Sequence, residues 1–253
     1  MSVEISNNQK NLSFSGLQPQ KWKRALKYID LTPNSPVSDA FVKEMAQGIA
    51  SAGITGQKTI KGQKTRFVLA QKASDICPDL KGRKCPGWPE GTTWDNTPAL
   101  CYEKTVGFLE KPVGGQKVDI GDVRHEVGHQ LDNLFETITT KSGRKRPGAL
   151  FTATKGYTEA YLKDIKNLPE NMKKYGEKVK DADFFMDYII QKSTPKKADD
   201  YAKKEAFAEI YADFNGGGYQ ETASKGMAEL HRQVFPNTVA YIEKLLYLMG
   251  KRN

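Results

Sequence analysis

Apolar side chains recur at helical spacing along much of this chain. The strongest pattern runs from 119 to about 138, where one face of a helix would carry Val123, Val127, Leu131, Leu134 and Ile138. Further helices are expected over 20–31, 36–52, 157–168, 181–191, 199–214, 222–234 and 237–249. The second half of the chain is therefore predicted to be almost entirely helical.

Strand-like residues occur only in the first half. Segments 66–70 (RFVLA) and 100–110 combine aliphatic, aromatic and β-branched side chains, and each is expected to form a strand. Residues 77–98 are rich in Pro, Gly, Asp and Asn, so a loop carrying Trp88 and Trp94 is expected there. The order of these elements indicates an α+β fold.

A chain of 253 residues suits one large domain. We expect a flexible N-terminal segment at 1–16 and a single domain over 17–253. That domain would comprise an α+β lobe at about 17–138 and a helical C-terminal lobe at about 139–253.

The pentapeptide HEVGH at 125–129 matches the metal-binding motif HExxH. One helical turn separates His125 from His129, so both imidazoles project from one face and can bind one metal ion. Glu126 is offset by about 100° and suits a base that faces a metal-activated water. Asp132 and Glu136 continue this polar face, which is expected to line a cleft opposite the apolar stripe.

A catalytic zinc usually takes a third protein ligand. The position six residues after the motif holds Phe135, so the third ligand must come from elsewhere. The segment KKEAFAEIYADF offers carboxylates at four-residue steps, namely Glu205, Glu209 and Asp213. Two registers fit: the ligand is either Glu205 or Glu209, and the next acid along the helix orients a ligand histidine.

The segments HEVGHQLDN and EAFAEIYADF together resemble the catalytic domain of anthrax lethal factor and its relatives, which include the secreted Pro-Pro endopeptidases. Looser similarity is found at GWPEGTTWDN and FPNTVAYIEKL, so the resemblance covers about 66–249. It implies a zincin-like metallopeptidase with a small mixed sheet, an HExxH active-site helix and a mainly helical C-terminal lobe.

The same resemblance implies roles for individual residues. One Zn²⁺ per chain would be held by His125, His129 and Glu205. Glu126 would act as the general base, and Glu209 and Asp132 would support the ligands from behind. The family tyrosine that stabilises the oxyanion stands about seven residues before the ligand glutamate, whereas Tyr201 stands four before Glu205. Tyr201 is the expected donor, and Tyr188 and Tyr211 are the next candidates.

One further departure from the family is the length between the two zinc helices. About 75 residues separate His129 from Glu205, which predicts an additional helical insertion. The implied function is a zinc-dependent endopeptidase that hydrolyses a protein or peptide substrate through a zinc-activated water. The strand at 106–110 is expected to be the sheet edge along which that substrate aligns. The alternative is a zinc-bearing toxin-like or partner-binding module with little or no turnover, although Glu126 counts against it.

Charge and composition narrow the remaining possibilities. The net charge is +9, but the basic clusters are interrupted by Glu and Asp, which favours a solvated surface over nucleic-acid binding. No apolar run approaches the roughly 20 residues of a membrane span. The N-terminus shows no signal peptide, so we expect a cytoplasmic protein, export by a signal-less route (relatives are often secreted), or a mature form. The cysteines Cys77, Cys85 and Cys101 lack zinc-ribbon spacing; idle thiols are favoured over a Cys77–Cys85 disulfide.

Overall fold

A computed structural model describes residues 21–85, 90–102, 105–111, 117–133, 137–139, 145–147, 150–175, 188–217 and 224–251. The expected flexible segment 1–16 and residues Trp88, Leu134, Phe135 and Glu136 lie outside these ranges. The described helices are α1 (Lys21–Ala25), α2 (Asp39–Ser51), α3 (Gly53–Gln63), α4 (Ala73–Ile76), α5 (Ile120–Asn133), α6 (Lys155–Tyr175), α8 (Asp200–Phe214), α9 (Ser224–Val234) and α10 (Pro236–Lys251).

Four strands form a small mixed sheet in the first half of the chain. They are β1 (Ile29–Leu31), β2 (Arg66–Ala70), β3 (Ala99–Tyr102) and β4 (Thr105–Leu109), in the order β1-β2-β4-β3. The pairs β1–β2 and β2–β4 are parallel, whereas β3 pairs antiparallel with β4. A separate antiparallel pair joins β5 (Thr137–Thr139) to β6 (Lys145–Pro147).

This strand order corrects one expectation. Strand β4 lies between β2 and β3, so the segment 106–110 is not the edge of the sheet. The edge on that side is β3, because 100–110 forms two antiparallel strands rather than one. An extended partner could pair only with β3 or, at the far side, with β1.

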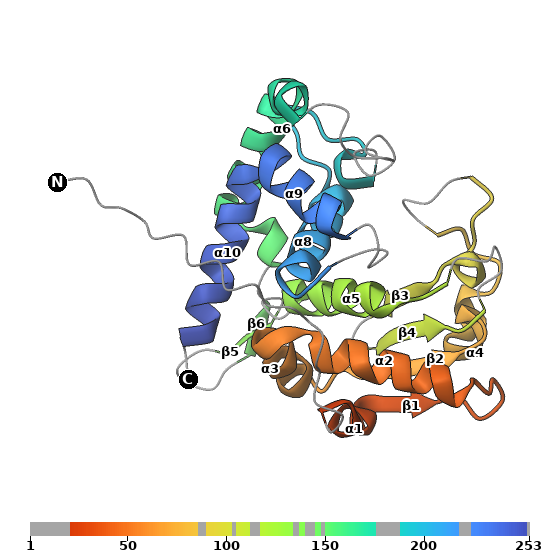
Figure 1. Cartoon of the computed structure of the whole chain (residues 1–253). Coiled ribbons are helices and arrows are strands. Elements are labelled where there is room, and N and C mark those ends of the chain that lie inside the picture. The colour runs from red at the N-terminus through yellow and green to blue at the C-terminus, as the bar shows by residue number, and fades with distance from the viewer. Residues whose placement is uncertain are drawn as a thin grey trace.

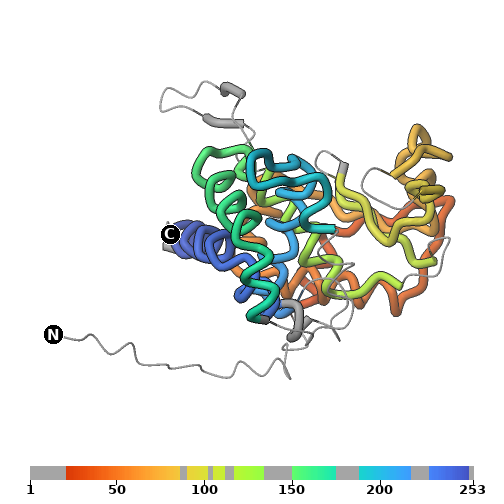
Figure 2. Tube along the Cα trace, turned by 90° about the horizontal axis from the view of Figure 1, so that it is seen from above, coloured from red at the N-terminus to blue at the C-terminus, as the bar shows by residue number. Residues whose placement is uncertain are grey.

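Helix α5 occupies the centre of the molecule. It packs against α2 and α3 on the sheet side and against α8 on the other side. Figure 1 shows α5 lying between α2 and α8, with α6, α9 and α10 grouped around α8. The view from above in Figure 2 shows these later helices, coloured green to blue, gathered apart from α4 and strands β2, β3 and β4, coloured orange to yellow.

One apolar core runs through this arrangement. Val123, Val127 and Leu131 on α5 are fully buried, and they belong to one cluster with Phe67 on β2 and Phe207 on α8. Burial of one aliphatic side chain contributes roughly 1.5–3 kcal/mol to stability. The buried stripe is therefore a main reason why α5 is held in this position.

The α+β class, the small mixed sheet and the mostly helical second half are confirmed. Three boundaries differ from expectation. Residues 29–31 form strand β1 instead of continuing the first helix, α5 ends at Asn133, and α6 continues through Pro169 to Tyr175. Helix α3 was not expected, because its sequence is polar and contains glycine, and it buries only Gly56, Thr59 and Ile60.

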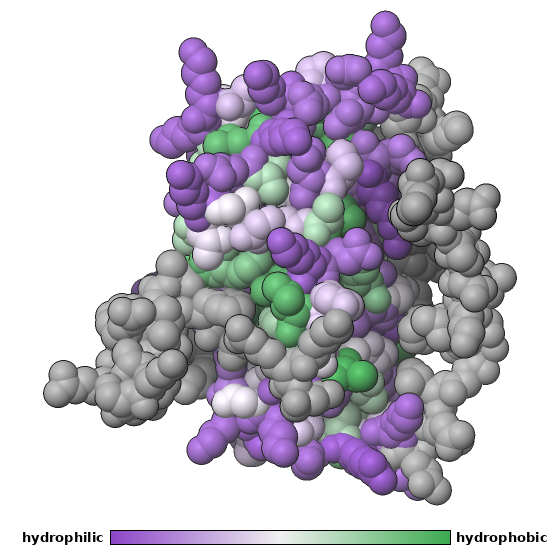
Figure 3. Space-filling model, turned by 90° about the vertical axis from the view of Figure 1, so that its left-hand side faces the viewer, coloured by the Kyte–Doolittle hydropathy of each residue, from purple (hydrophilic) through white to green (hydrophobic). Residues whose placement is uncertain are grey.

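Figure 3 shows one face of the molecule, with hydrophilic side chains at both ends and smaller apolar areas between them. Within the described ranges, none of the helices combines the length and apolar character that crossing a membrane requires.

Candidate metal centre

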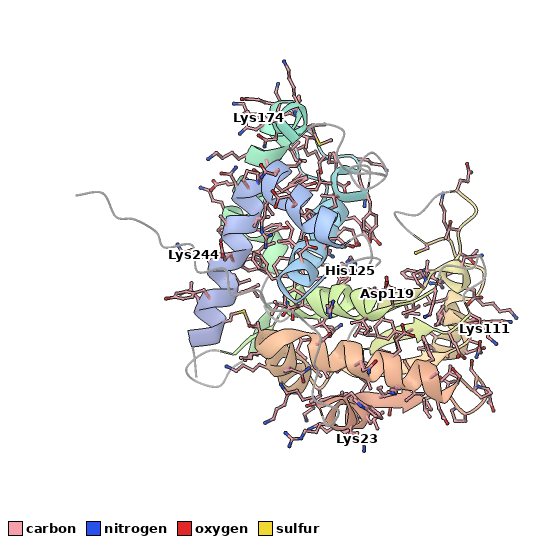
Figure 4. All side chains as sticks on the ribbon, in the orientation of Figure 1. Lys23, Lys111, Asp119, His125, Lys174 and Lys244 are labelled. Atoms are coloured by element: carbon pink, nitrogen blue, oxygen red, sulfur yellow. The ribbon has the colours of Figure 1, made fainter. Side chains whose placement is uncertain are left out.

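The histidines of the HEVGH segment and the carboxylates of the later acidic helix face each other across the α5–α8 interface. Figure 4 places His125 on α5, close to α8. Helix α5 begins at a cap in which the Asp119 carboxylate accepts hydrogen bonds from the backbone N–H groups of Gly121 and Asp122. Helix α8 begins similarly, since Asp199 accepts bonds from Tyr201 and Ala202. Both helices are therefore fixed at their N-terminal ends.

The close approach of these helices depends on Gly128. A Cβ atom added there would lie 2.8 Å from Ala208 Cα and 3.1 Å from Ala208 O, both backbone atoms of α8. Side chains essentially never make such short contacts. Because Gly128 and Ala208 are small residues, α5 and α8 can pack closely at this point.

Three potential ligand atoms converge in this interface. The Nε2 atoms of His125 and His129 lie 3.0 Å apart, and Glu205 Oε2 lies 3.2 Å from the first and 3.4 Å from the second. A tetrahedral ion with bonds of about 2.1 Å requires ligand atoms about 3.4 Å apart. The group could therefore hold a metal ion with little movement of its side chains. His129 is the most exposed of the three side chains, at 16%.

The second nitrogen of His125 faces Glu209. His125 Nδ1 lies 2.9 Å from Glu209 Oε1, so this carboxylate can hold the proton on Nδ1 and leave Nε2 free for a metal. Burial alone would lower the pKa of His125, but the charges of Glu209 and Glu205 raise it well above its usual value. The site therefore carries a negative surplus that favours a cation.

Glu126 lies beside this group without a partner of its own. Its Oε2 is buried and has no hydrogen-bond partner among the residues that the structure describes. Burial raises the pKa of its carboxyl, although His129 and His125 act in the opposite direction. A buried carboxylate without a partner costs free energy, so its place beside a candidate metal position needs a functional reason.

Two tyrosines approach Glu205. The Tyr188 hydroxyl donates a hydrogen bond to Glu205 Oε2, and Tyr201 also bonds the Glu205 side chain. Burial raises the pKa of both hydroxyls, so both keep their protons and can act as donors. Tyr211 is excluded from this role because its hydroxyl donates to the Ala52 carbonyl, 2.6 Å away.

The remaining predicted residues have other surroundings. Asp132 accepts bonds of 2.8 Å from the backbone N–H and the hydroxyl of Thr152, so it anchors the segment before α6 and bonds neither histidine. The three cysteines are free thiols, and nearby Glu205 and Glu126 contribute, after burial, to raising the pKa of Cys85 to about 12. Cys85 therefore stays protonated close to the site, a proximity that sequence spacing did not indicate.

Replacing Gly128 by Ala is expected to push α5 and α8 apart. Overpacking of this kind typically costs about 1–3 kcal/mol of unfolding free energy, and it would also separate the histidines from Glu205. We expect a lower denaturation midpoint together with weaker metal binding, measured by urea unfolding and chelator competition.

Gly62 provides the matched control. It also lies in a helix, but an added Cβ would meet nothing within 4 Å, so Gly62→Ala should not destabilise the protein. Equal stability of the Gly128→Ala and Gly62→Ala variants would show that the helices tolerate separation.

Comparison with known proteins gives one informative result. No family model matches this chain, and no curated protein matches it. Among solved structures, the fold is similar to that of a Pro-Pro endopeptidase from Paenibacillus alvei, with a TM-score of 0.51 and 17% sequence identity. The similarity covers 87% of this chain and 97% of the other chain, so the shared fold includes nearly the whole of that endopeptidase.

Proposed function

We propose that this protein is a zinc-dependent endopeptidase related to the lethal factor and Pro-Pro endopeptidase group. The observation that carries the proposal is the convergence of His125, His129 and Glu205 beside Glu126, whose buried Oε2 has no hydrogen-bond partner within the described ranges. The fold shared with a Pro-Pro endopeptidase supports the same assignment. A structural metal site or a binding module has no use for a carboxylate in this position, whereas a hydrolase uses it as a base.

The three residues provide two imidazole nitrogens and one carboxylate oxygen, a set that suits zinc better than calcium or magnesium. A bound zinc ion would acidify a water molecule and polarise the carbonyl of the bond to be cut. Glu209 would keep the His125 ring in the tautomer that presents Nε2 to the ion.

Glu126 would serve as the general base. Burial is the main cause that raises the pKa of the Glu126 carboxyl. A higher pKa makes the carboxylate a stronger base, which can accept a proton and then release it to the leaving amine. Because the described residues leave Oε2 free, no internal bond has to break before the carboxylate accepts that proton.

An extended peptide would have an available strand next to the site. Strand β3 is the sheet edge nearest α5, and Gln130 on α5 donates a 2.9 Å bond to Cys101 Sγ on β3. A peptide that pairs through its backbone with β3 would lie next to His125 and His129.

Tyr201 and Tyr188 are both candidates for stabilising the oxyanion. Removing one such donor typically lowers turnover about 10²–10³-fold, so one of the variants Tyr201→Phe and Tyr188→Phe should show that loss with its zinc content unchanged. Peptide-cleavage kinetics and metal analysis of the two purified variants measure this.

Tyr211→Phe is the control for this pair. It should lose about 0.5–1.5 kcal/mol of stability with the Ala52 bond and keep wild-type turnover. Wild-type turnover in both Tyr201→Phe and Tyr188→Phe would show that neither hydroxyl stabilises the oxyanion.

The proposed function is tested by metal analysis and peptide cleavage. We expect about one zinc per chain, cleavage within a peptide library that includes Pro-Pro sequences, loss of cleavage with a chelator and recovery with added zinc. A zinc-loaded protein that cleaves no peptide would favour a binding module, and a protein without zinc would refute the proposal.

A further inference from the structure

A second buried histidine lies behind the candidate metal centre. His231 on α9 is 1% exposed, and its Nδ1 is hydrogen-bonded to Asp213 Oδ2 on α8. The Asp213 side chain is itself only 7% exposed. His231 is the one histidine of this chain outside the HEVGH segment, and nothing in the proposed chemistry uses it directly.

Helix geometry connects this pair to the metal centre. Glu209 and Asp213 stand one turn apart on α8, so their side chains share a face. Burial raises the pKa of Asp213, the charge of His231 lowers it, and the charge of Glu209 raises it. Along α8, the Asp213–His231 hydrogen bond lies one helical turn from the Glu209 carboxylate that faces His125.

We propose that His231, held by Asp213, is a positioning residue that fixes the Glu209 carboxylate and through it the ligand His125. The inference rests on the proposed zinc function and adds an element to it, since it makes α9 part of the support of the metal centre.

A purely structural role for the pair is the competing explanation. Leu230 and Val234 on the same helix are fully buried and belong to the apolar core, so α9 packs into that core next to His231. Buried ion pairs can often be replaced by apolar residues without loss of stability, so such a pair is not needed for folding alone. The two explanations differ in what they predict for metal affinity.

The test compares His231→Phe and Asp213→Asn with the wild-type chain. Mutation of groups that support ligand histidines typically lowers metal affinity 10–100-fold. We expect zinc affinity, measured by chelator competition, to fall about tenfold in each variant. The absorption spectrum of the cobalt-loaded protein should change as well, because the orientation of the His125 ring changes. His231→Asn keeps a donor near Nδ1 and should recover part of the affinity.

Val234→Ala is the matched control. It removes buried apolar volume from the same helix, so it should lower the melting temperature of the metal-free protein and leave zinc affinity and the cobalt spectrum unchanged. A structural role would give the His231 and Asp213 variants this same behaviour.

Two failures can be told apart. If the wild-type chain binds no zinc, the proposed function falls and this inference falls with it. If the wild-type chain binds zinc and the variants bind it equally well, only the positioning role is refuted. Should His231→Phe fail to fold, Asp213→Asn decides the question, because it preserves the shape of the side chain.

Discussion

Replacing Glu126 by Gln should lower peptide hydrolysis about 10²–10⁴-fold while one zinc per chain is retained. The amide has nearly the shape of the carboxylate but cannot accept a proton, and general bases contribute about this much to turnover. Because Glu126 belongs to neither the His125–His129–Glu205 group nor its supporting bonds, removal of its charge should leave those contacts in place. Stability should rise slightly, since an unpartnered buried charge is lost.

The measurement is steady-state cleavage of a peptide substrate with metal content determined on the same preparation. Glu170→Gln on α6 is a suitable control, since it also removes one carboxylate but from an exposed pair with Lys174. Turnover in the Glu126→Gln variant equal to that of the control would rule out the assigned base.

Glu205→Gln should weaken zinc binding by more than about 100-fold, whereas Glu209→Gln should weaken it by about 10–100-fold. Glu205 Oε2 lies 3.2 and 3.4 Å from the two Nε2 atoms, but Glu209 approaches the far side of His125 at Nδ1. Losing a metal ligand should therefore lower zinc affinity more than losing a group that only orients a ligand. Competition with a chelator of known affinity gives both values.

These two glutamates control for each other, because both are buried, both stand on α8 and both lose one charge. The opposite ranking would mean that the metal ligand is Glu209, one helical turn after Glu205 on α8.

The sequence predicted the two helices of the site well because their signals are local. The spacing of His125 and His129 follows from the helical period, and the helix expected over 199–214 agrees with α8 at Asp200–Phe214. The choice between Glu205 and Glu209 could not be made from spacing, since both share one face. It requires the packing of α5 on α8, which depends on the contact between Gly128 and Ala208.

Other features were missed for similar reasons. The polar face of α5 was expected to line a cleft, but His125, Glu126 and Asp132 are all nearly buried, because α8 covers that face with carboxylates that match it. Tyr188 was only a secondary candidate, because it reaches Glu205 from a separate segment and no periodic pattern relates the two. The scarcity of histidine was the single sequence signal that could have drawn attention to His231.

The position of the ligands along the chain has a consequence for the order of folding. His125 and His129 come together as soon as one helix forms, whereas Glu205 arrives only after about 75 further residues have been synthesised and α8 has packed on α5. Contacts between such distant segments form late, because closing a long loop costs entropy before the contact stabilises it. A nascent chain would thus display the histidine pair well before it had a complete site. Under the proposed function, hydrolytic activity would appear only once α8 had packed on α5.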